Sequence, residues 1–375
     1  MSGITTVTTP RIKTALVMAG GTGGHIFPGL AVAEALRLVG WRVYWLGAPN
    51  SMESRLVPPK GFALETINFS GVRGKGVVAL TLLPLRLLKA FWQSIQVIRR
   101  VKPDVVLGLG GYISFPAGMM AVLMGKPLVL HEQNSVAGMA NKALAVVADR
   151  VFTAFPNVFA KGHCIGNPLR PEFLNQAEPA ARFAGRSGPL RLLVVGGSLG
   201  ATALNDMVPK AIALLPLEQR PTILHQSGHK QIDVLRANYQ TAGVQAELTP
   251  FIDDTATAFA QADLVICRSG ASTVTELAAV GVAAALVPFP FAVDNHQTAN
   301  ARFLSDQGAA LLVQQSQLTP QWIADMLQKA ERFTLIKQAQ KAKSMQKIHA
   351  TEEIVKACEE LSGGSGKEAL QGAVL

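Results

Sequence analysis

The chain has 375 residues, of which 49% are hydrophobic but only 6% aromatic, so its length predicts two domains with aliphatic cores. Its net charge of +10 suits anionic partners, namely phosphorylated substrates, acidic lipid or nucleic acid. The three cysteines lie far apart without metal-ligand spacing, so we expect free thiols in a reducing compartment, and we expect neither a secretory signal nor an unbroken membrane-spanning helix.

The first part of the chain alternates apolar strands with helices. A Thr-rich start at 1–10 precedes an apolar strand at 16–19, which leads into the glycine turn GGTGGH. A helix follows this turn; we expect His25 at its start and residues 30–38 within it. Further elements are predicted as strands at 42–46, 104–109, 127–131 and 150–154 and as a helix with an early proline at 84–100. Strands that are apolar throughout and alternate with helices indicate a buried parallel sheet.

The same alternation of apolar strands and helices, again with a glycine turn after the first strand, follows the turn-rich segment GNPLRPEF that joins the two parts. The expected elements are a strand at 190–195, the turn GGSLGA, a helix over 205–215, strands at 222–226, 264–267 and 284–288, and a charged helical end at 321–361. We therefore predict two α/β domains with parallel sheets, at 11–168 and 169–344. A helix at about 345–362 is expected to pack back on the first domain, and 363–375 is expected to be a flexible tail.

The glycine turn predicts an anion site, because backbone N–H groups and a helix N-terminus converge there. A dinucleotide is excluded, since Ile26 replaces the last glycine of that fingerprint and no carboxylate ends the second strand of either domain. There is no P-loop lysine for ATP hydrolysis. Two divergent glycine turns facing a shared cleft instead suit a nucleotide-sugar donor on one side and an acceptor on the other.

Two later segments fit such a donor. In RSGASTVTELAAVG a helix is expected to begin near Ser272 or Thr273, where N–H groups and hydroxyls hold a diphosphate. Glu276, in the first turn of that helix, either binds the ribose hydroxyls or only stabilises the helix start. In DNHQTAN, clustered amides suit sugar hydroxyls, although an ordinary polar helix start is the commoner explanation of such a segment taken alone.

Eight segments in register resemble the MurG family of bacterial UDP-N-acetylglucosamine (UDP-GlcNAc) transferases: GGTGGHIFPGLAVA, GLGGYISFPAG, HEQN, GNPLR, GGSLGA, FIDD, RSGASTVTE and DNHQTANA. The resemblance spans residues 16 to about 361 and implies a glycosyltransferase-B fold, two Rossmann-like domains facing a central cleft. It implies a cofactor-free, inverting transfer of N-acetylglucosamine to the muramyl 4-hydroxyl of undecaprenyl-diphosphate-MurNAc-pentapeptide. This step converts lipid I to lipid II in peptidoglycan synthesis, and hence serves cell-wall biogenesis, cell shape and cell division.

The resemblance also places the donor site. The residues that match the family's UDP-GlcNAc site are Thr22, Gly23, Gly24, Asn134, Arg170, Ser198, Ile252, Ala271, Ser272, Thr273, Val274, Thr275, Glu276 and Gln297. Among them, Ile252 would meet the uracil and Gln297 the sugar, while Arg170 either binds the donor or pairs with backbone carbonyls at the joint. The chain departs from the family pattern at Leu199 and His296, where glutamine is common.

Inversion requires one displacement, with a base for the attacking hydroxyl and positive potential for the departing diphosphate. His25 is the candidate base, because a helix N-terminus disfavours imidazolium and should leave the ring neutral. Alternatively, His25 is a structural hydrogen-bonding group or only binds the acceptor. Glu132 is the rival base, or else an architectural carboxylate of its loop. No paired-aspartate motif is present, so we expect no metal site and metal-independent chemistry.

The segment 66–103 contains no acidic residue and carries a basic, apolar helix. The expected membrane-associating residues are Leu85, Leu88, Phe91, Trp92, Arg86 and Lys89. Such a stripe suits an interfacial helix on anionic lipid, although a core-facing stripe is the alternative. With the lipid-borne acceptor of the family, this predicts a peripheral protein on the cytoplasmic face of the bacterial inner membrane, where other cell-wall synthesis proteins are possible partners.

Two other functions fit parts of this pattern. A UDP-GlcNAc epimerase of the same architecture would share the donor site but need no acceptor. A nucleic-acid-binding protein would use the positive charge, but the densest basic segment lacks the interleaved exposed rings that stack on bases, so we expect no nucleic acid partner.

Overall fold

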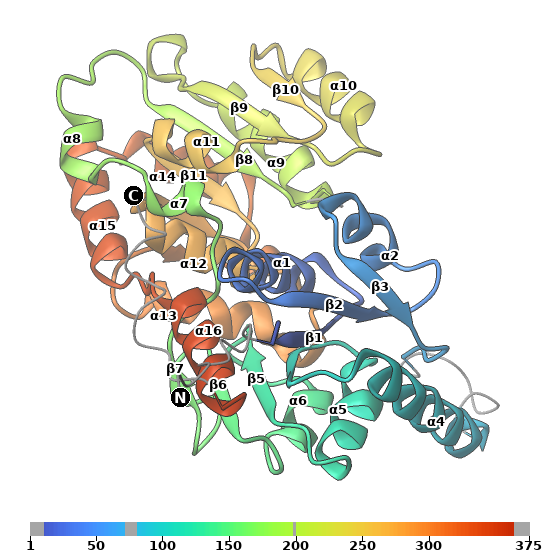
Figure 1. The fold of residues 1–375 in the computed structure, drawn as a ribbon. Helices are drawn as coiled ribbons and strands as arrows, with labels where there is room; N and C mark the ends of the chain where they lie inside the picture. Colours follow the sequence, from blue (N-terminus) through green and yellow to red (C-terminus); the bar gives the residue numbers. More distant parts are fainter. Residues whose placement is uncertain (1–10, 72–80, 198–199, 364–375) are drawn as a thin grey trace, which may run out of the picture.

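A computed structural model describes residues 11–71, 81–197 and 200–363. They form two α/β lobes, each built on a sheet of parallel strands (Figure 1). The N-terminal lobe contains a seven-stranded sheet of order β3-β2-β1-β4-β5-β6-β7. Its strands are β1 (Thr14–Ala19), β2 (Arg42–Gly47), β3 (Ala63–Thr66), β4 (Val105–Gly110), β5 (Leu128–Glu132), β6 (Arg150–Thr153) and β7 (His163–Cys164). Its helices are α1 (Gly23–Leu38), α2 (Met52–Leu56), α4 (Leu83–Val101), α5 (Ser114–Leu123) and α6 (Met139–Leu144).

The C-terminal lobe contains a six-stranded sheet of order β10-β9-β8-β11-β12-β13. Its strands are β8 (Arg191–Val195), β9 (Thr222–Gln226), β10 (Glu247–Thr249), β11 (Leu264–Cys267), β12 (Ala283–Leu286) and β13 (Leu311–Leu312). Its helices are α7 (Pro171–Leu174), α8 (Pro179–Phe183), α9 (Thr202–Ala213), α10 (Ile232–Ala242), α11 (Thr255–Gln261), α12 (Ala271–Val280), α13 (His296–Ser305), α14 (Pro320–Gln328) and α15 (Arg332–Ser344).

The predicted fold class is confirmed, and the local differences have simple causes. The first helix begins at Gly23, so it includes residues 30–38 and has His25 in its first turn, as predicted. The end of the glycine turn is itself helical after the extended residue Thr22. The strands β3, β7, β10 and β13 escaped prediction, since they have two to four residues, lie toward the sheet edges and are only partly buried. Short, half-exposed strands carry little hydrophobic periodicity.

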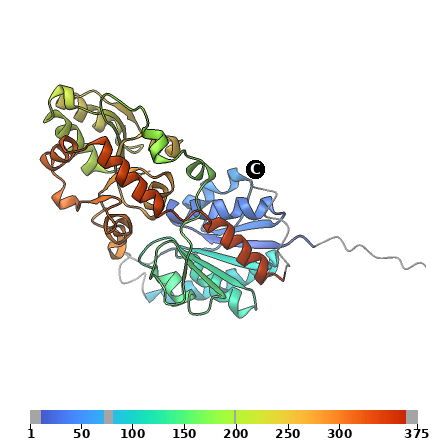
Figure 2. The same ribbon diagram turned by 90° about the vertical axis from the view of Figure 1, so that its left-hand side faces the viewer.

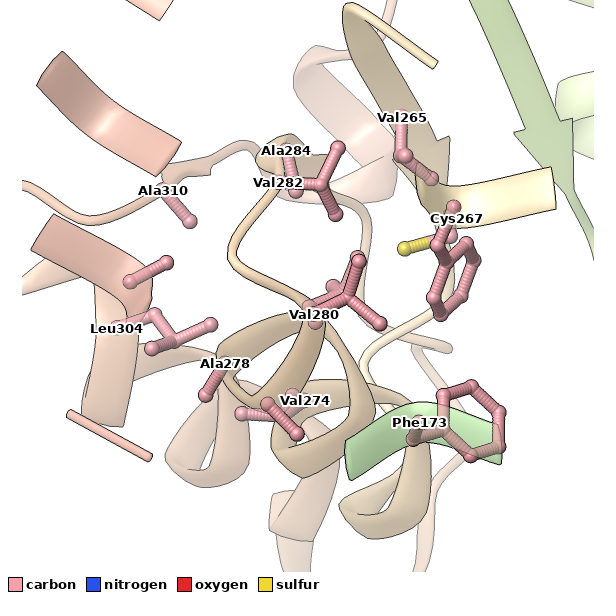
Figure 3. Close-up of a cluster of buried hydrophobic side chains, with 14 of the residues drawn as sticks. Phe173, Val265, Cys267, Val274, Ala278, Val280, Val282, Ala284, Leu304 and Ala310 are labelled. Carbon is pink, nitrogen blue, oxygen red and sulfur yellow. The ribbon is translucent and has the colours of Figure 1, made fainter. Parts of the chain in front are cut away.

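The core of the C-terminal lobe fixes the helix that follows β11 (Figure 3). Val274 and Ala278 of α12 pack in one buried cluster with Cys267 of β11 and Phe173 of α7. Because this face of α12 is buried, its N-terminus is held at the carboxyl end of β11. In parallel sheets this edge is where ligands bind.

The last helix returns to the N-terminal lobe. The chain crosses to the C-terminal lobe between β7 and α7, and crosses back between α15 and α16 (Ala350–Leu361) (Figure 2). Ile354, Val355 and Cys358 of α16 are buried in one cluster with Val32 and Leu36 of α1. The two ends of the described chain therefore share one core.

Helix α4 forms the outer edge of the N-terminal lobe, beside α5 (Figure 1). Its inner face buries Val97, Ile98 and Val101. No helix among the described residues is long and apolar enough to cross a membrane.

Candidate functional site

The first glycine turn is held by a buried carboxylate. Glu53 of α2 is fully buried and accepts hydrogen bonds from the backbone N–H groups of Gly21 (3.1 Å) and Ala48 (2.9 Å). Gly20 makes room for it, since a Cβ there would lie 2.8 Å from Glu53 Oε1. The backbone N–H groups of Gly23 and Gly24 follow this turn and lie at the start of α1, where they have no carbonyl partner within the helix.

His25 lies in the first turn of α1 and contacts Gln133 of the HEQN segment. Its Nδ1 lies 2.9 Å from Oε1 of Gln133. Its ring rests against Gly110, where a Cβ would lie 3.0 Å from ring atoms and where φ is +102°. Glycine at this position therefore fits both the backbone conformation and the space taken by the imidazole.

Glu132 is almost completely buried, and its contacts lie within its own loop and the helix that follows. Oε1 accepts from the backbone N–H of Asn134 at 3.0 Å. Oε2 accepts from the backbone N–H of Gly138 at 3.1 Å and from Nδ2 of Asn141 at 2.9 Å. Both oxygens of this carboxylate are therefore occupied by donors that shape the loop.

His131 connects the same segment to the joint between the lobes. Its Nε2 lies 2.8 Å from the carbonyl oxygen of Gly166, and its Nδ1 lies 3.0 Å from Nε2 of Gln133. Burial lowers the pKa of His131 to about 4, so the ring is neutral at physiological pH.

Hydrogen bonds continue from this segment into the C-terminal lobe. Asn300 of α13 accepts from Ser135 and donates to Oδ1 of Asn134 and to the carbonyl of Ser269, each at 3.3 Å. The Ser269 hydroxyl donates to the carbonyl of Gln297 at 2.8 Å. A connected polar network therefore runs from His25 on one lobe to Gln297 on the other.

The N-terminus of α12 offers free donors. Its first intrahelical bond runs from the N–H of Val274 to the carbonyl of Gly270 (3.0 Å), so the amides of Ala271, Ser272 and Thr273 have no carbonyl within the helix. The Ser272 hydroxyl is buried and has no hydrogen-bond partner among the described residues. A buried hydroxyl and amides without partners fit a bound anion.

The next two residues of α12 face elsewhere. Val274 lies in the core, and the Thr275 hydroxyl donates to the carbonyl of Ala271 (3.1 Å) and lies 3.3 Å from Nδ2 of Asn167. Both were predicted as donor-site residues. Their donor-binding roles stay predictions, and their side chains pack the helix against the core and against the joint between the lobes.

Glu276 lies in the second turn of α12, not in the first as predicted, because the helix already begins at Ala271. Burial raises the pKa of its carboxyl to about 7, while the charge of Arg170 acts in the opposite direction. Arg170 stacks on the ring of Phe173 at 5.0 Å, and no hydrogen bond ties it to a backbone carbonyl in the described parts of the chain. The position of Glu276 argues against a role in stabilising the helix start, since that effect fades after the first turn.

The remaining donor-site residues lie on two loops. Oε1 of Gln297 accepts from the N–H of Phe289 at 2.9 Å, which leaves its amide N–H₂ as a donor. Ile252 is half-buried against the core of the C-terminal lobe. Ser198 and Leu199 lie outside the described residues.

Comparison with known proteins identifies the family. The N-terminal and C-terminal domains of glycosyltransferase family 28 match residues 15–153 and 191–358. A relative from Paracidovorax citrulli is 71% identical over 93% of this chain and 99% of its own length, and one from Polaromonas naphthalenivorans is 71% identical over 94% and 99%. Both are named UDP-N-acetylglucosamine--N-acetylmuramyl-(pentapeptide) pyrophosphoryl-undecaprenol N-acetylglucosamine transferase. The crystal structure of Acinetobacter baumannii MurG superposes with a TM-score of 0.82 and 41% identity, covering 93% of this chain and 99% of that one.

The chain belongs to the MurG family. The predicted family, fold class and enzyme class are thereby confirmed: it is a glycosyltransferase with the two-lobed B fold. A UDP-glucosyltransferase from Polygonum tinctorium shares the fold at 12% identity, with a TM-score of 0.65 over 95% of this chain and 99% of that one.

One of the two departures from the family pattern now has a local explanation. His296 is half-buried, and its Nδ1 lies 2.7 Å from the carbonyl of Val293, within the turn that precedes α13. A histidine at this position in a MurG-family chain therefore stabilises its own turn.

Five buried residues of this MurG-family site were not predicted individually, namely Glu53, His131, Gln133, Asn167 and Asn300. Four of them lie within the quoted motifs HEQN, GNPLR and DNHQTANA, so the available signal was a polar residue within a motif that the sequence analysis had already singled out. Glu53 gave no such signal, because a glutamate in a short helix resembles a surface residue. In the described parts of the chain, no group of three or more His, Cys, Asp or Glu side chains is arranged to hold a metal ion.

Proposed function

We propose that this chain transfers N-acetylglucosamine from UDP-GlcNAc to the muramyl 4-hydroxyl of lipid I, with inversion, and so produces lipid II. The observation that carries the proposal is the polar network from His25 to Gln297, because it joins a potential base on one lobe to donor-site groups on the other. The names and high identity of the relatives support the same substrates.

The donor would lie along the N-terminus of α12. The amides of Ala271, Ser272 and Thr273 would bind the diphosphate, and the ionised carboxylate of Glu276 would accept hydrogen bonds from the ribose hydroxyls. Arg170 adds positive charge beside Glu276. Ile252 would meet the uracil, and Gln297 would donate to the sugar.

Other predicted residues complete this donor site. Asn134 would meet the sugar, and its hydrogen bond from Asn300 supports this role by tying it to the C-terminal lobe. The amides of Gly23 and Gly24, with Thr22, form the wall on the N-terminal lobe, and Ser198 would approach the diphosphate from the second glycine turn.

The chemistry needs one base and one stabilised leaving group. The 4-hydroxyl oxygen forms a bond to the anomeric carbon as the bond from that carbon to the diphosphate oxygen breaks. The hydroxyl proton passes to Nε2 of His25, and UDP leaves with its charge facing the α12 amides. The donors around both oxygens of Glu132 favour its architectural role over its role as the rival base.

The acceptor carries a lipid, and α4 suits the membrane that holds it. Leu85, Leu88 and Trp92 keep 65%, 64% and 59% of their surface exposed, on the face opposite the buried Ala90 and Val97. The core-facing alternative is therefore disfavoured. Arg86 and Lys89 flank the stripe, and Phe91 is half-buried near the ring of Phe115. We infer peripheral binding to anionic lipid on the cytoplasmic face of the inner membrane.

The domain boundaries follow from the two crossings of the chain between the lobes. We infer an acceptor-side and membrane-side domain of residues 11–168 together with about 345–362, and a donor-side domain of residues 169–344. From residue 364 onward, the predicted tail lies outside the described residues.

The test offers radiolabelled UDP-GlcNAc together with a short-chain lipid I analogue, with and without EDTA. We expect label to move to the lipid in both cases. Donor consumption without acceptor would instead indicate an epimerase. Loss of transfer in EDTA that magnesium restores would contradict metal-independent chemistry.

A second experiment tests the base. A folded His25→Ala variant should lose kcat far more than donor affinity; near-normal turnover would remove His25 from catalysis. A gel shift with nucleic acid at physiological salt should be negative.

A further inference from the structure

We propose that Gln133 and His131 are positioning residues that fix the tautomer of His25, with the proton on Nδ1 and the lone pair on Nε2. The inference rests on the proposed function, in which Nε2 of His25 receives the acceptor proton. Neither residue touches substrate in this account. They act through a chain of hydrogen bonds that ends at a backbone carbonyl.

The direction of each hydrogen bond in this chain can be assigned by starting from the backbone carbonyl of Gly166. The carbonyl of Gly166 has no proton to give, so Nε2 of His131, 2.8 Å away, must carry one. Since His131 is neutral, its Nδ1 is then an acceptor, and it receives a hydrogen from the side-chain amide of Gln133 at 3.0 Å. The amide oxygen of Gln133 faces Nδ1 of His25 at 2.9 Å and must accept there. Nδ1 of His25 therefore carries its proton.

The orientation of the Gln133 amide does not depend on the imidazoles alone. Its Nε2 also donates to the backbone carbonyl of His131 at 3.1 Å. If the amide were turned over, its oxygen would face that carbonyl at the same distance, and two acceptors would repel each other. Gln133 and His131 are both fully buried, so water does not compete for these positions.

The consequence is that Nε2 of His25 is already unprotonated, and able to accept a proton, before the acceptor binds. A histidine in water prefers the proton on Nε2, which would make that atom a donor and unable to receive the acceptor proton. In His25, Nδ1 is engaged by Gln133, and Nε2 has no hydrogen-bond partner among the described residues. In a serine protease, replacing the carboxylate that orients the catalytic histidine leaves the ring in the wrong tautomer and lowers kcat by about four orders of magnitude.

The partner here is a neutral amide, unlike the carboxylate of a serine-protease triad. Gln133 accepts one hydrogen bond from the ring and cannot take up a proton. The chain therefore selects a tautomer without placing a negative charge beside His25.

The direct test is ¹⁵N NMR of the full-length protein labelled only at its histidines, of which there are seven. We expect a protonated Nδ1 and an unprotonated Nε2 for His25, and the reverse for His131. The signals are assigned with His25→Ala and His131→Asn. An unprotonated Nδ1 on His25 in the unmodified protein would overturn the inference, whatever the activity.

The kinetic test uses Gln133→Leu, which removes the side-chain hydrogen bonds to His25 and His131, and Gln133→Glu, which keeps an acceptor for His25. We expect Gln133→Leu to lower kcat about 100-fold with the KM for UDP-GlcNAc changed less than about twofold, and to move the His25 proton to Nε2. Gln133→Glu should recover part of the loss. Equal losses in both variants, or a change confined to KM, would contradict a tautomer role.

The matched control is Tyr239→Phe in the C-terminal lobe. The Tyr239 hydroxyl lies 3.0 Å from Nδ1 of the buried His225, so this variant also removes the Nδ1 partner of a buried histidine, but away from the site. Its kcat should stay within about twofold of the unmodified enzyme. If the spectra show the expected His25 tautomer but His25→Ala turns over normally, the base role fails while the assignment of the positioning residues stands.

Discussion

Asn300 accepts two hydrogen bonds from Ser135, at 2.8 Å from the backbone N–H and 2.7 Å from the hydroxyl, although the two residues are 165 positions apart. Asn300 is fully buried on α13 of the C-terminal lobe, and Ser135 follows β5 of the N-terminal lobe. The lobes of this MurG-family enzyme are therefore joined by a specific polar contact at the position of the proposed site. Neutral amides and hydroxyls make such a contact without the desolvation cost of an ion pair.

We predict that Asn300→Ala weakens both the fold and catalysis. It leaves the Ser135 and Ser269 groups without their buried partner, at a cost of about 1–3 kcal/mol for each unsatisfied group. The melting temperature should fall by several degrees, and kcat/KM for UDP-GlcNAc by about tenfold. Differential scanning calorimetry and initial rates measure the two effects.

Asn238→Ala is the control for Asn300→Ala. Nδ2 of Asn238 donates to the carbonyl of Asn205 and to Asp206, each at 3.0 Å, entirely within the C-terminal lobe. It should lower the melting temperature but keep kcat/KM. Equal kinetic losses in the two variants would mean that the contact between the lobes has no special role.

We predict that donor affinity rises with pH around neutrality because of Glu276. Its pKa of about 7 in the unliganded protein means that the carboxyl is largely protonated at pH 6, whereas accepting hydrogen bonds from two ribose hydroxyls needs the ionised form. The dissociation constant should therefore fall by up to about tenfold per pH unit below pH 7 and level off above pH 8.

Isothermal titration between pH 5.5 and 8.5 measures this effect. UDP-GlcNAc is the right ligand, because its diphosphate diester has no ionisation near neutral pH, unlike the terminal phosphate of UDP. Glu276→Gln should bind more weakly at pH 8 and lose the pH dependence. The same slope in both proteins would assign the effect to another group.

We predict that Gly110→Ala impairs the proposed base. The added methyl group would lie 3.0 Å from atoms of the His25 ring, so the imidazole must move, and the positive φ adds backbone strain. We expect kcat to fall about 100-fold with a smaller change in donor KM. Gly40→Ala is the matched control, since Gly40 also has a positive φ (+88°) but has open space around it. Similar kinetic losses in both variants would point to backbone strain alone.

We predict that the exposed stripe on α4 binds anionic vesicles. Replacing Leu85, Leu88 and Trp92 together by serine should reduce co-sedimentation with phosphatidylglycerol-containing vesicles at least about tenfold, because each large apolar side chain gains about 1.5–3 kcal/mol when buried. The melting temperature should hardly change, since these side chains are already exposed. Raising the salt concentration should weaken binding of the unmodified protein.

The matched control for α4 replaces the exposed Leu214 and Leu217 of the C-terminal lobe by serine. This variant should sediment like the unmodified protein. Binding that is indifferent to lipid charge, or that both sets of substitutions reduce equally, would show that α4 is not the membrane surface.

Much of the architecture could be predicted from local pattern. The apolar run that became β11 has the predicted bounds, because a strand buried on both faces is apolar at every position. The strand β9 also has the predicted bounds, although its sequence TILHQ is only partly apolar. The glycine turn before α1 also predicted an anion site from local sequence, because the backbone conformation of such a turn depends on residues adjacent in sequence. The family resemblance depended on eight such local segments in order.

The partners inside the site could not be predicted in this way. His25 was recognised as a candidate from its place at a helix start, but Gln133, which holds its Nδ1, is 108 residues away. The sequence by itself determined two parallel sheets, the glycine turns and the polar motifs at the ends of the strands. Only the tertiary structure decided which of those polar groups meet, because strand order and the packing of one lobe on the other bring distant side chains within hydrogen-bonding distance.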